Sequence, residues 1–261
     1  MKTYETILLS KGEAATVIKL NRPDKRNAIS IKMMDEVIDA LIESDRDSDI
    51  RAVVLTGGES YFAAGADLNE ALQVKTAEQG MSYFRRWHRL NKTIEELGKP
   101  VIAAIEGFCI TGGLELALAC DIRVAGEGST FAITSSKIGT VAGAGGTQRL
   151  PRIVGLSNAL DILFAADPID AKEAHRIGLV NRLVPRGGAL DAAKAIVKVY
   201  QQRAPLSLAL VKRAVHRGMQ MDLDSAIDLE TFLVTTIYGT EDKLEGISAF
   251  LEKRTAKFKG K

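Results

Sequence analysis

The stretch that decides the fold is Pro100-Val101-Ile102-Ala103-Ala104-Ile105, with Thr111-Gly112-Gly113-Leu114-Glu115 shortly downstream. The first part is a short apolar run that ends in a glycine-containing segment, and it predicts a buried strand. A helix over 114–119 and a strand over 122–125 follow. Strands that alternate with helices are typical of a mostly parallel sheet covered by helices, so we predict an α/β fold.

The same alternation extends to both sides of this stretch. Upstream, the sequence predicts a β-hairpin around 11–13, a strand over 51–56 and a long helix over 77–97 that Pro100 ends. Ser30 is the expected N-cap of another helix. The apolar side of this helix is formed by Met33, Met34, Val37, Ile38, Leu41 and Ile42.

Downstream of Asp170 the pattern is helical, apart from an expected strand over 179–184. Helices are expected over 189–201, 206–217, 223–238 and 241–253. We therefore predict two parts, an α/β core over residues 1–200 and a helical region over residues 201–261.

Composition excludes several classes of protein. The 261 residues carry a net charge of only +2, which gives no field for binding nucleic acid. No apolar run approaches the roughly 18 residues of a membrane helix, and the N-terminus lacks the pattern of a signal peptide. Cys109 and Cys120 have no metal-ligand spacing and the histidines occur singly, so we expect reduced cysteines, no metal site and a cytoplasmic protein.

Three glycine clusters interrupt the apolar segments. They are Ala63-Ala64-Gly65-Ala66-Asp67, Thr111-Gly112-Gly113-Leu114-Glu115 and Gly143-Ala144-Gly145-Gly146-Thr147. Each follows a strand-like run, and the second and third open helices. Small residues leave backbone N–H groups accessible, and a helix N-terminus aims several of them in one direction. None of the clusters matches a phosphate-binding loop or a dinucleotide fingerprint, so nucleotide chemistry loses its main support.

Two such turns can stabilise one carbonyl oxygen as it becomes an oxyanion. Glu115 lies one helical turn beyond Gly112, within reach of atoms near that oxygen. A lone glutamate inside Leu-Glu-Leu-Ala-Leu-Ala-Cys is unusual in a buried helix, because a carboxylate there needs either an ion pair or a function. Glu115 is therefore the first candidate for catalysis.

Several motifs resemble, in order along nearly the whole chain, those of the enoyl-CoA hydratase/isomerase (crotonase) superfamily. The resemblance implies a crotonase-like ββα spiral core with a C-terminal helical trimerisation region, assembled as a trimer or as a hexamer made of two trimers. The matching segments are Leu20-Asn21-Arg22-Pro23 with Asn27-Ala28, Phe62 to Leu68, Pro100 to Gly107, Gly112 to Leu116, Gly143 to Leu150, and Ala249 to Arg254.

The resemblance also implies an acyl-CoA thioester as substrate, with no separate cofactor. The N–H groups of Ala66 and Gly112 would form the oxyanion hole, and Glu115 would match the first of the two catalytic glutamates. The backbone near Ala64 would face the adenine ring. The residues implied to contact substrate or coenzyme A are Lys25, Arg26, Ala28, Ala64, Asp67, Leu68, Gly113, Gly143 and Lys253, with Lys253 coming from a neighbouring subunit.

The sequence departs from the family pattern at three positions. Ser135 occupies the place of the second glutamate, Ala142 replaces a frequent proline, and Thr111 stands where glycine is common. A hydroxyl can hold a water molecule but cannot replace a carboxylic acid at neutral pH. Either Glu115 performs both proton transfers of a hydration, or the reaction is a double-bond isomerisation or a thioester hydrolysis.

A non-enzymatic alternative is a catalytically silent member of the family that serves as an assembly or binding subunit. Some relatives bind RNA through a lysine-rich helix, but the corresponding segment here, 32–44, carries Asp35, Glu36, Asp39 and Glu43, which disfavours binding to phosphates.

Overall fold

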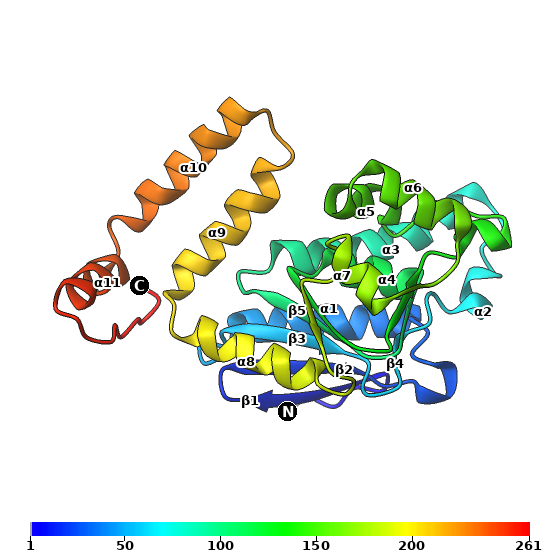
Figure 1. The fold of residues 1–261 in the computed structure, drawn as a ribbon, viewed down its shortest axis with the longest axis horizontal. Coiled ribbons are helices and arrows are strands. Elements are labelled where there is room, and N and C mark those ends of the chain that lie inside the picture. Colours follow the sequence, from blue (N-terminus) through cyan, green and yellow to red (C-terminus); the bar gives the residue numbers. More distant parts are fainter. Residues whose placement is uncertain (1) are drawn as a thin grey trace.

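The computed structural model describes residues 2–261, which form two sheets surrounded by helices (Figure 1). The larger sheet has the order β1-β2-β3-β5-β7-β10, and the smaller sheet has the order β4-β6-β8-β9. In the larger sheet only the β1–β2 pair is antiparallel, and in the smaller sheet only β8–β9 is. The strands are β1 (Ile7–Gly12), β2 (Ala15–Leu20), β3 (Ala52–Thr56), β4 (Tyr61–Ala63), β5 (Val101–Ile105), β6 (Phe108–Ile110), β7 (Ile122–Gly126), β8 (Thr130–Ala132), β9 (Ile169–Asp170) and β10 (Arg182–Val184).

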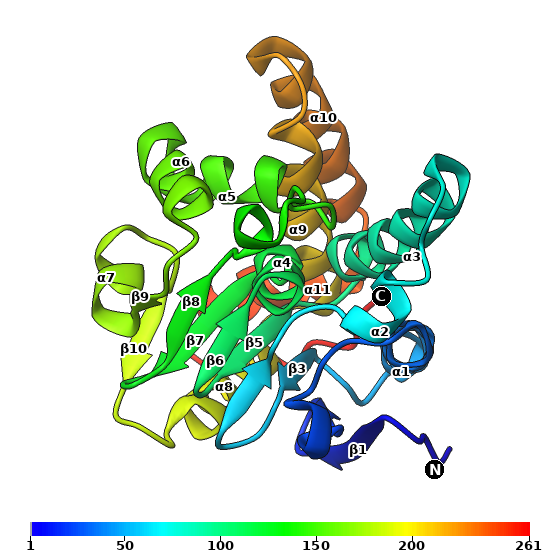
Figure 2. The same ribbon diagram turned by 90° about the vertical axis from the view of Figure 1, so that its right-hand side faces the viewer.

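The chain builds the two sheets together, as a spiral. The pairs β3–β4, β5–β6 and β7–β8 each place their first strand in the larger sheet and their second strand in the smaller one. Helices return the chain to the next turn: α2 (Leu68–Ala71) and α3 (Ala77–Glu96), then α4 (Gly112–Ala119), then η2 (Ser135–Ile138), α5 (Gly146–Val154) and α6 (Leu156–Ala165). The helix α4 packs against β4 and β6 of the smaller sheet (Figure 2).

Both faces of the larger sheet are buried, as its continuous apolar strands predict. Along β5, Val101, Ala103 and Ile105 belong to the main core, whereas Ile102 and Ala104 point to a second, smaller core. The second core is closed by α8 (Ala189–Gln201), which packs on β3, β5 and β7. The predicted α/β architecture is confirmed.

The helix α1 (Ile31–Arg46) begins where the sequence predicts, because the Ser30 side chain accepts a hydrogen bond from Met33 N at 3.2 Å. Three details of the sequence reading are wrong. Ile42 is exposed rather than buried, β10 begins only at Arg182, and the Gly143 cluster follows the 3-10 helix η2 rather than a strand. The strand starts late because Val180 N is already bonded to Ala174 O, in the turn after α7 (Ala171–Arg176).

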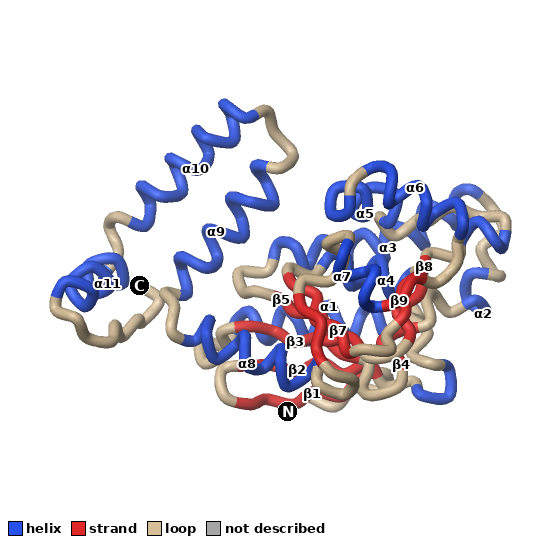
Figure 3. The backbone as a smooth tube through the Cα atoms, in the orientation of Figure 1, coloured by secondary structure: helices blue, strands red, loops and turns tan. Residues whose placement is uncertain are grey.

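From α8 onward the described chain forms only helices and the loops that connect or follow them (Figure 3). The helices α9 (Pro205–Gly218) and α10 (Leu223–Ile237) pair with each other and project from the sheets, and α11 (Glu241–Leu251) follows at the end opposite α2 (Figure 1). The division at residue 200 stays a prediction. Within residues 2–261 no helix is both long enough and apolar enough to cross a membrane.

Candidate active site

The first and second glycine clusters meet in space. A Cβ atom added to Gly112 would lie 3.1 Å from Ala66 N, and one added to Gly65 would lie 3.7 Å from Gly112 N. Ala66 follows strand β4 and Gly112 is the first residue of α4, so the parallel pairing of β4 with β6 brings the two turns to the same end of the smaller sheet. The family resemblance implies that these two residues are paired donors, and the structure places them close together.

Backbone pairing determines where the Ala66 N–H points. Ile29 N donates to Gly65 O at 2.8 Å, and Asp67 N donates to Ile29 O at 2.9 Å. In this parallel bridge the polar groups on either side of Ala66 face Ile29, so the N–H of Ala66 itself points away from Ile29. Gly112 N is the first amide of a helix and has no carbonyl partner within it. Both N–H groups are therefore free to bind one acceptor.

The fit around α4 leaves no space for side chains at its first two positions. A Cβ on Gly112 would come 2.7 Å from Trp87 Cη2, and a Cβ on Gly113 would come 2.5 Å from Ala63 O. Trp87, on α3, is only 1% exposed and cannot move aside. The two glycines thus allow the helix N-terminus to approach the first turn closely.

Thr111, the residue just before α4, is held by its side chain in a backbone conformation that normally favours glycine. Its backbone has a positive φ of 47° with ψ −109°, a combination that is strained for a β-branched residue. Its Oγ1 lies 2.9 Å from Thr134 Oγ1 and accepts a hydrogen bond from Thr134 N at 3.0 Å. These contacts stabilise the strained conformation of Thr111. They also connect the turn before α4, which contains Gly112, to the segment that contains Ser135.

Glu115 is buried, at 3% exposure, on the first turn of α4. Its partners are backbone amides rather than a cation: Ala144 N and Gly146 N both donate to Oε1, each at 2.8 Å. Burial raises the pKa of Glu115 from 4.5 to about 7, against the lowering effects of the Gly146 and Ala144 amides and of Arg149. A carboxyl group with this pKa can both accept and release a proton near neutral pH.

Ser135 is buried as the first residue of η2, and its carbonyl accepts the hydrogen bond of Thr140 N at 3.1 Å. Among residues 2–261 no hydrogen bond joins it to Glu115. The segment 131–146 contains no aspartate or glutamate, so it supplies no second carboxyl group.

The expected coenzyme-binding residues lie around the first turn. Lys25 and Arg26 are exposed at the end of η1 (Pro23–Lys25), and Ala64 N donates to Arg26 O at 3.0 Å, so the Ala64 backbone lies beside them. Ala28 is half-buried in the same turn, where its carbonyl accepts from Arg22. Leu68 is exposed at the start of α2.

Asp67 has a structural role in this arrangement. Its carboxylate pairs with Arg22 at 2.8 Å and accepts a hydrogen bond from Asn69 N at 3.0 Å, so it caps α2 and fastens the first turn. A contact of Asp67 with the ligand stays a prediction. Gly143 is closely packed, since a Cβ there would lie 2.3 Å from Phe84 Cε1. Lys253 is exposed two residues beyond α11, and α11 lies at the end of the molecule opposite α2 (Figure 1). The expected contribution of Lys253 from a neighbouring subunit stays a prediction.

Sequence reasoning did not find Arg22, Asn91, Glu95 or Arg149 as parts of the site. Asn91 offered a signal, because it is a polar residue on the otherwise apolar side of α3 formed by Tyr83, Trp87, Leu90 and Ile94. In the described part of the chain no group of three histidine, cysteine or acidic side chains is arranged to hold a metal ion. The absence of a metal and of a separate cofactor stays a prediction.

Comparison with known proteins agrees with this geometry. The family model described as enoyl-CoA hydratase/isomerase matches residues 10–261. A short-chain-enoyl-CoA hydratase of Clostridium acetobutylicum is 39% identical over 97% of both chains, and a crotonyl-CoA hydratase of Syntrophomonas wolfei is 39% identical over 98% of both. The crystal structure of an enoyl-CoA hydratase from Bacillus anthracis superposes with a TM-score of 0.93 at 35% identity, covering 98% of this chain and all of the other. This superposition confirms the expected crotonase-like spiral. The chain belongs to the enoyl-CoA hydratase/isomerase family.

Proposed function

We propose that the protein catalyses the reversible hydration of 2-enoyl-CoA thioesters. The observation that carries the proposal is the position of one buried, anchored carboxyl group, Glu115, one helical turn from the paired amides of Ala66 and Gly112. The names of two relatives, a short-chain-enoyl-CoA hydratase and a crotonyl-CoA hydratase, support the same reaction.

In this proposal the thioester carbonyl oxygen accepts hydrogen bonds from Ala66 N and Gly112 N. The Glu115 carboxylate takes a proton from water as the water oxygen adds to the β-carbon. The electron pair of the double bond moves toward the carbonyl, and the resulting enolate oxygen is stabilised by the two amides. The Glu115 carboxyl group then gives its proton to the α-carbon, which completes the addition of water and restores the carboxylate.

In this proposal Glu115 alone performs both proton transfers, from water and to the α-carbon. One of its carboxyl oxygens is anchored and the other is free to exchange the proton. Oε1 is held by Ala144 N and Gly146 N, which leaves Oε2 to exchange protons. A pKa of about 7 means that neither protonation state is strongly disfavoured during turnover. Ser135 is assigned the lesser role of a hydrogen-bond partner for the water.

The test uses Glu115→Gln, which keeps the size and the Oε1 acceptor but removes the exchangeable proton. Crotonyl-CoA is the first substrate, with hydration followed by loss of the enoyl absorbance and coenzyme A binding measured by calorimetry. The variant is expected to bind coenzyme A normally and to lose at least about 10²-fold in kcat. Turnover close to wild type would refute the proposal.

Double-bond isomerisation is the second candidate, favoured specifically by serine at position 135. An isomerase needs only one group that moves a proton between carbons. Turnover in water enriched in heavy oxygen separates the two reactions, since only hydration places the label in the product. Release of free coenzyme A, detected with a thiol reagent, would instead indicate thioester hydrolysis.

We further propose a trimer, or a dimer of trimers, in the cytoplasm, with no cofactor beyond the coenzyme A of the substrate. The helical region supports assembly because α10, α11 and the turn between them expose large apolar side chains to solvent. They include Phe232 (69% exposed), Tyr238 (63%), Phe250 (82%) and Leu251 (74%). In such an assembly Lys253 of one subunit would join Lys25 and Arg26 of another at the phosphates of coenzyme A.

A further inference from the structure

The Gly143–Gly146 turn, whose amides bind Glu115, also accepts hydrogen bonds through the carbonyl of Ala144. Ala144 N and Gly146 N point toward Glu115 Oε1, and the carbonyl between them, Ala144 O, accepts hydrogen bonds on the other side. A buried carbonyl needs a donor, and its direction determines the plane of the peptide group that links residues 144 and 145. This peptide group lies between the two that carry the amides of Ala144 and Gly146, so whatever binds Ala144 O restrains the middle of the turn that presents them.

Asn91 is the first of these donors. Its Nδ2 donates to Ala144 O at 2.7 Å, and the residue is completely buried in α3. Its Oδ1 has no partner among the described residues. An apolar side chain of the same size would avoid this unsatisfied oxygen. The hydrogen bond to Ala144 is thus the one contact that explains an amide at this position.

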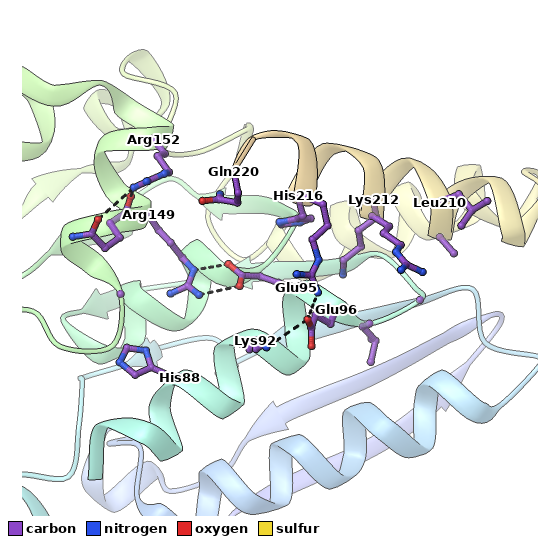
Figure 4. Close-up of a pocket in the computed structure, with 17 residues that line it drawn as sticks. His88, Lys92, Glu95, Glu96, Arg149, Arg152, Leu210, Lys212, His216 and Gln220 are labelled. Carbon is purple, nitrogen blue, oxygen red and sulfur yellow. Dashed lines mark hydrogen bonds and ion pairs between the residues drawn. The ribbon is translucent and has the colours of Figure 1, made fainter. Parts of the chain in front are cut away.

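Arg149 is the second donor. Its Nη1 donates to Ala144 O at 3.2 Å, while its Nε and Nη2 bind both oxygens of Glu95 at 2.6 and 3.0 Å. Figure 4 shows this ion pair bridging α5 and α3. Gly145 leaves room for the guanidinium, since a Cβ there would lie 1.9 Å from Nη1 and the backbone has φ 103°.

We infer that Asn91 and the Arg149–Glu95 pair are positioning residues, which hold the Gly143–Gly146 turn so that its amides fix Glu115 Oε1 and present Oε2 to the substrate. This inference rests on the proposed function. Among residues 2–261 none of the three side chains hydrogen-bonds to Glu115. They act on it through the Ala144 backbone, and Arg149 also acts through its charge, which lowers the pKa of Glu115. The three residues come from α3 and α5, and these helices also pack against α4.

The main test is Asn91→Leu, which keeps the branched shape of the side chain, with somewhat larger terminal groups, and removes the donor. Loss of the anchor should lower kcat on crotonyl-CoA by about 10- to 100-fold, because a small displacement of a catalytic group is sufficient for such a loss. KM should stay within about threefold, since no coenzyme contact is changed. The acid limb of the pH profile of kcat/KM should also move to higher pH, because weaker amide donation raises the pKa of Glu115.

Two further variants keep the test decisive. Arg149→Lys retains the charge beside Glu95 but cannot bind both Glu95 oxygens and Ala144 O. Its kcat should therefore fall, but by less than that of Asn91→Leu. Arg152→Gln is the matched control, because Arg152 lies one turn later on α5 and, among the described residues, its side chain hydrogen-bonds only to Gln148. It should leave kcat, KM and the pH profile unchanged.

The outcomes separate this inference from the proposed function. Suppose that Glu115→Gln is inactive, but that folded Asn91→Leu has the wild-type kcat and an unchanged acid limb of its pH profile. These results would overturn the positioning role and leave the proposed function standing. If Asn91→Leu does not fold, an unchanged kcat in Arg149→Lys would overturn it equally. Full turnover by Glu115→Gln would remove both proposals at once.

Discussion

The substitution Gly112→Ala tests how close the two glycine turns must be. Alanine is normally favoured over glycine in a helix, and Gly112 does not have the positive φ that would exclude a side chain. The obstacle is space alone. The new methyl group would lie 2.7 Å from Trp87 Cη2 and 3.1 Å from Ala66 N, whereas carbon atoms in contact are about 3.5–4.0 Å apart.

The overlap with Trp87 is therefore about 1 Å. Trp87 is fully enclosed in the core, so the N-terminus of α4 has to move away from Ala66 by a similar distance. An amide that binds an oxygen at about 2.9 Å would then lie beyond hydrogen-bonding distance. Loss of one oxyanion donor lowers kcat by about 10²–10³-fold, which corresponds to about 2.7–4 kcal/mol.

The assay is hydration of crotonyl-CoA, with circular dichroism and coenzyme A binding to verify the fold. Gly12→Ala is the control, because a Cβ at Gly12 would meet no atom within 4 Å. It should behave as wild type. The fall should appear mainly in kcat, since the donors bind the charge that develops in the transition state. A kcat for Gly112→Ala within threefold of wild type would refute the reasoning about the paired amides.

Three further predictions follow from the same geometry. Replacing Lys25 and Arg26 by glutamine should raise KM about fivefold per charge with kcat unchanged, and equal KM values at low and high salt would contradict their contact with phosphates. Glu115→Gln should increase the free energy of unfolding at pH 8 by at most about 3 kcal/mol, because the folded pKa near 7 lies above the unfolded value of 4.5. In urea titrations this gain in stability should vanish below pH 4.5, where the wild-type carboxyl is protonated in both the folded and the unfolded state. A gain that does not change with pH would show that burial does not raise the pKa of Glu115. Phe250→Asp should shift the sedimentation coefficient toward that of a monomer, because a charge would replace an exposed apolar side chain of α11. An unchanged value would show that α11 is not part of the subunit interface.

Much of the fold followed from local pattern. The apolar runs at 52–56, 101–105 and 122–126 form strands, as expected for runs that are shorter than a typical helix. Ser30 and Pro100 mark helix ends for local reasons, because the serine side chain caps a helix start and proline cannot continue a helix. The assignment of alternate strands to two sheets did not follow from local pattern. It depends on pairing between distant segments, such as β4 with β6, and only the family resemblance supplied it.

The site divides in the same way. Glu115 and the glycine clusters were found because a buried carboxylate and runs of small residues are unusual in apolar sequence, whereas the family resemblance supplied Ala66 and Gly112 as the individual donors. Asn91 and Arg149 were missed because both bind Ala144 O, a backbone atom more than fifty residues away from Asn91 in the chain. The Thr111–Thr134 contact was equally hidden, since nothing in the sequence shows that the two side chains meet.

The most direct test of the account is a crystal structure of the Glu115→Gln variant with crotonyl-CoA bound. The account predicts the thioester oxygen within about 2.7–3.1 Å of both Ala66 N and Gly112 N. It also predicts the β-carbon on the side of residue 115. A thioester oxygen that contacts neither amide, or that lies in another part of the molecule, would contradict it.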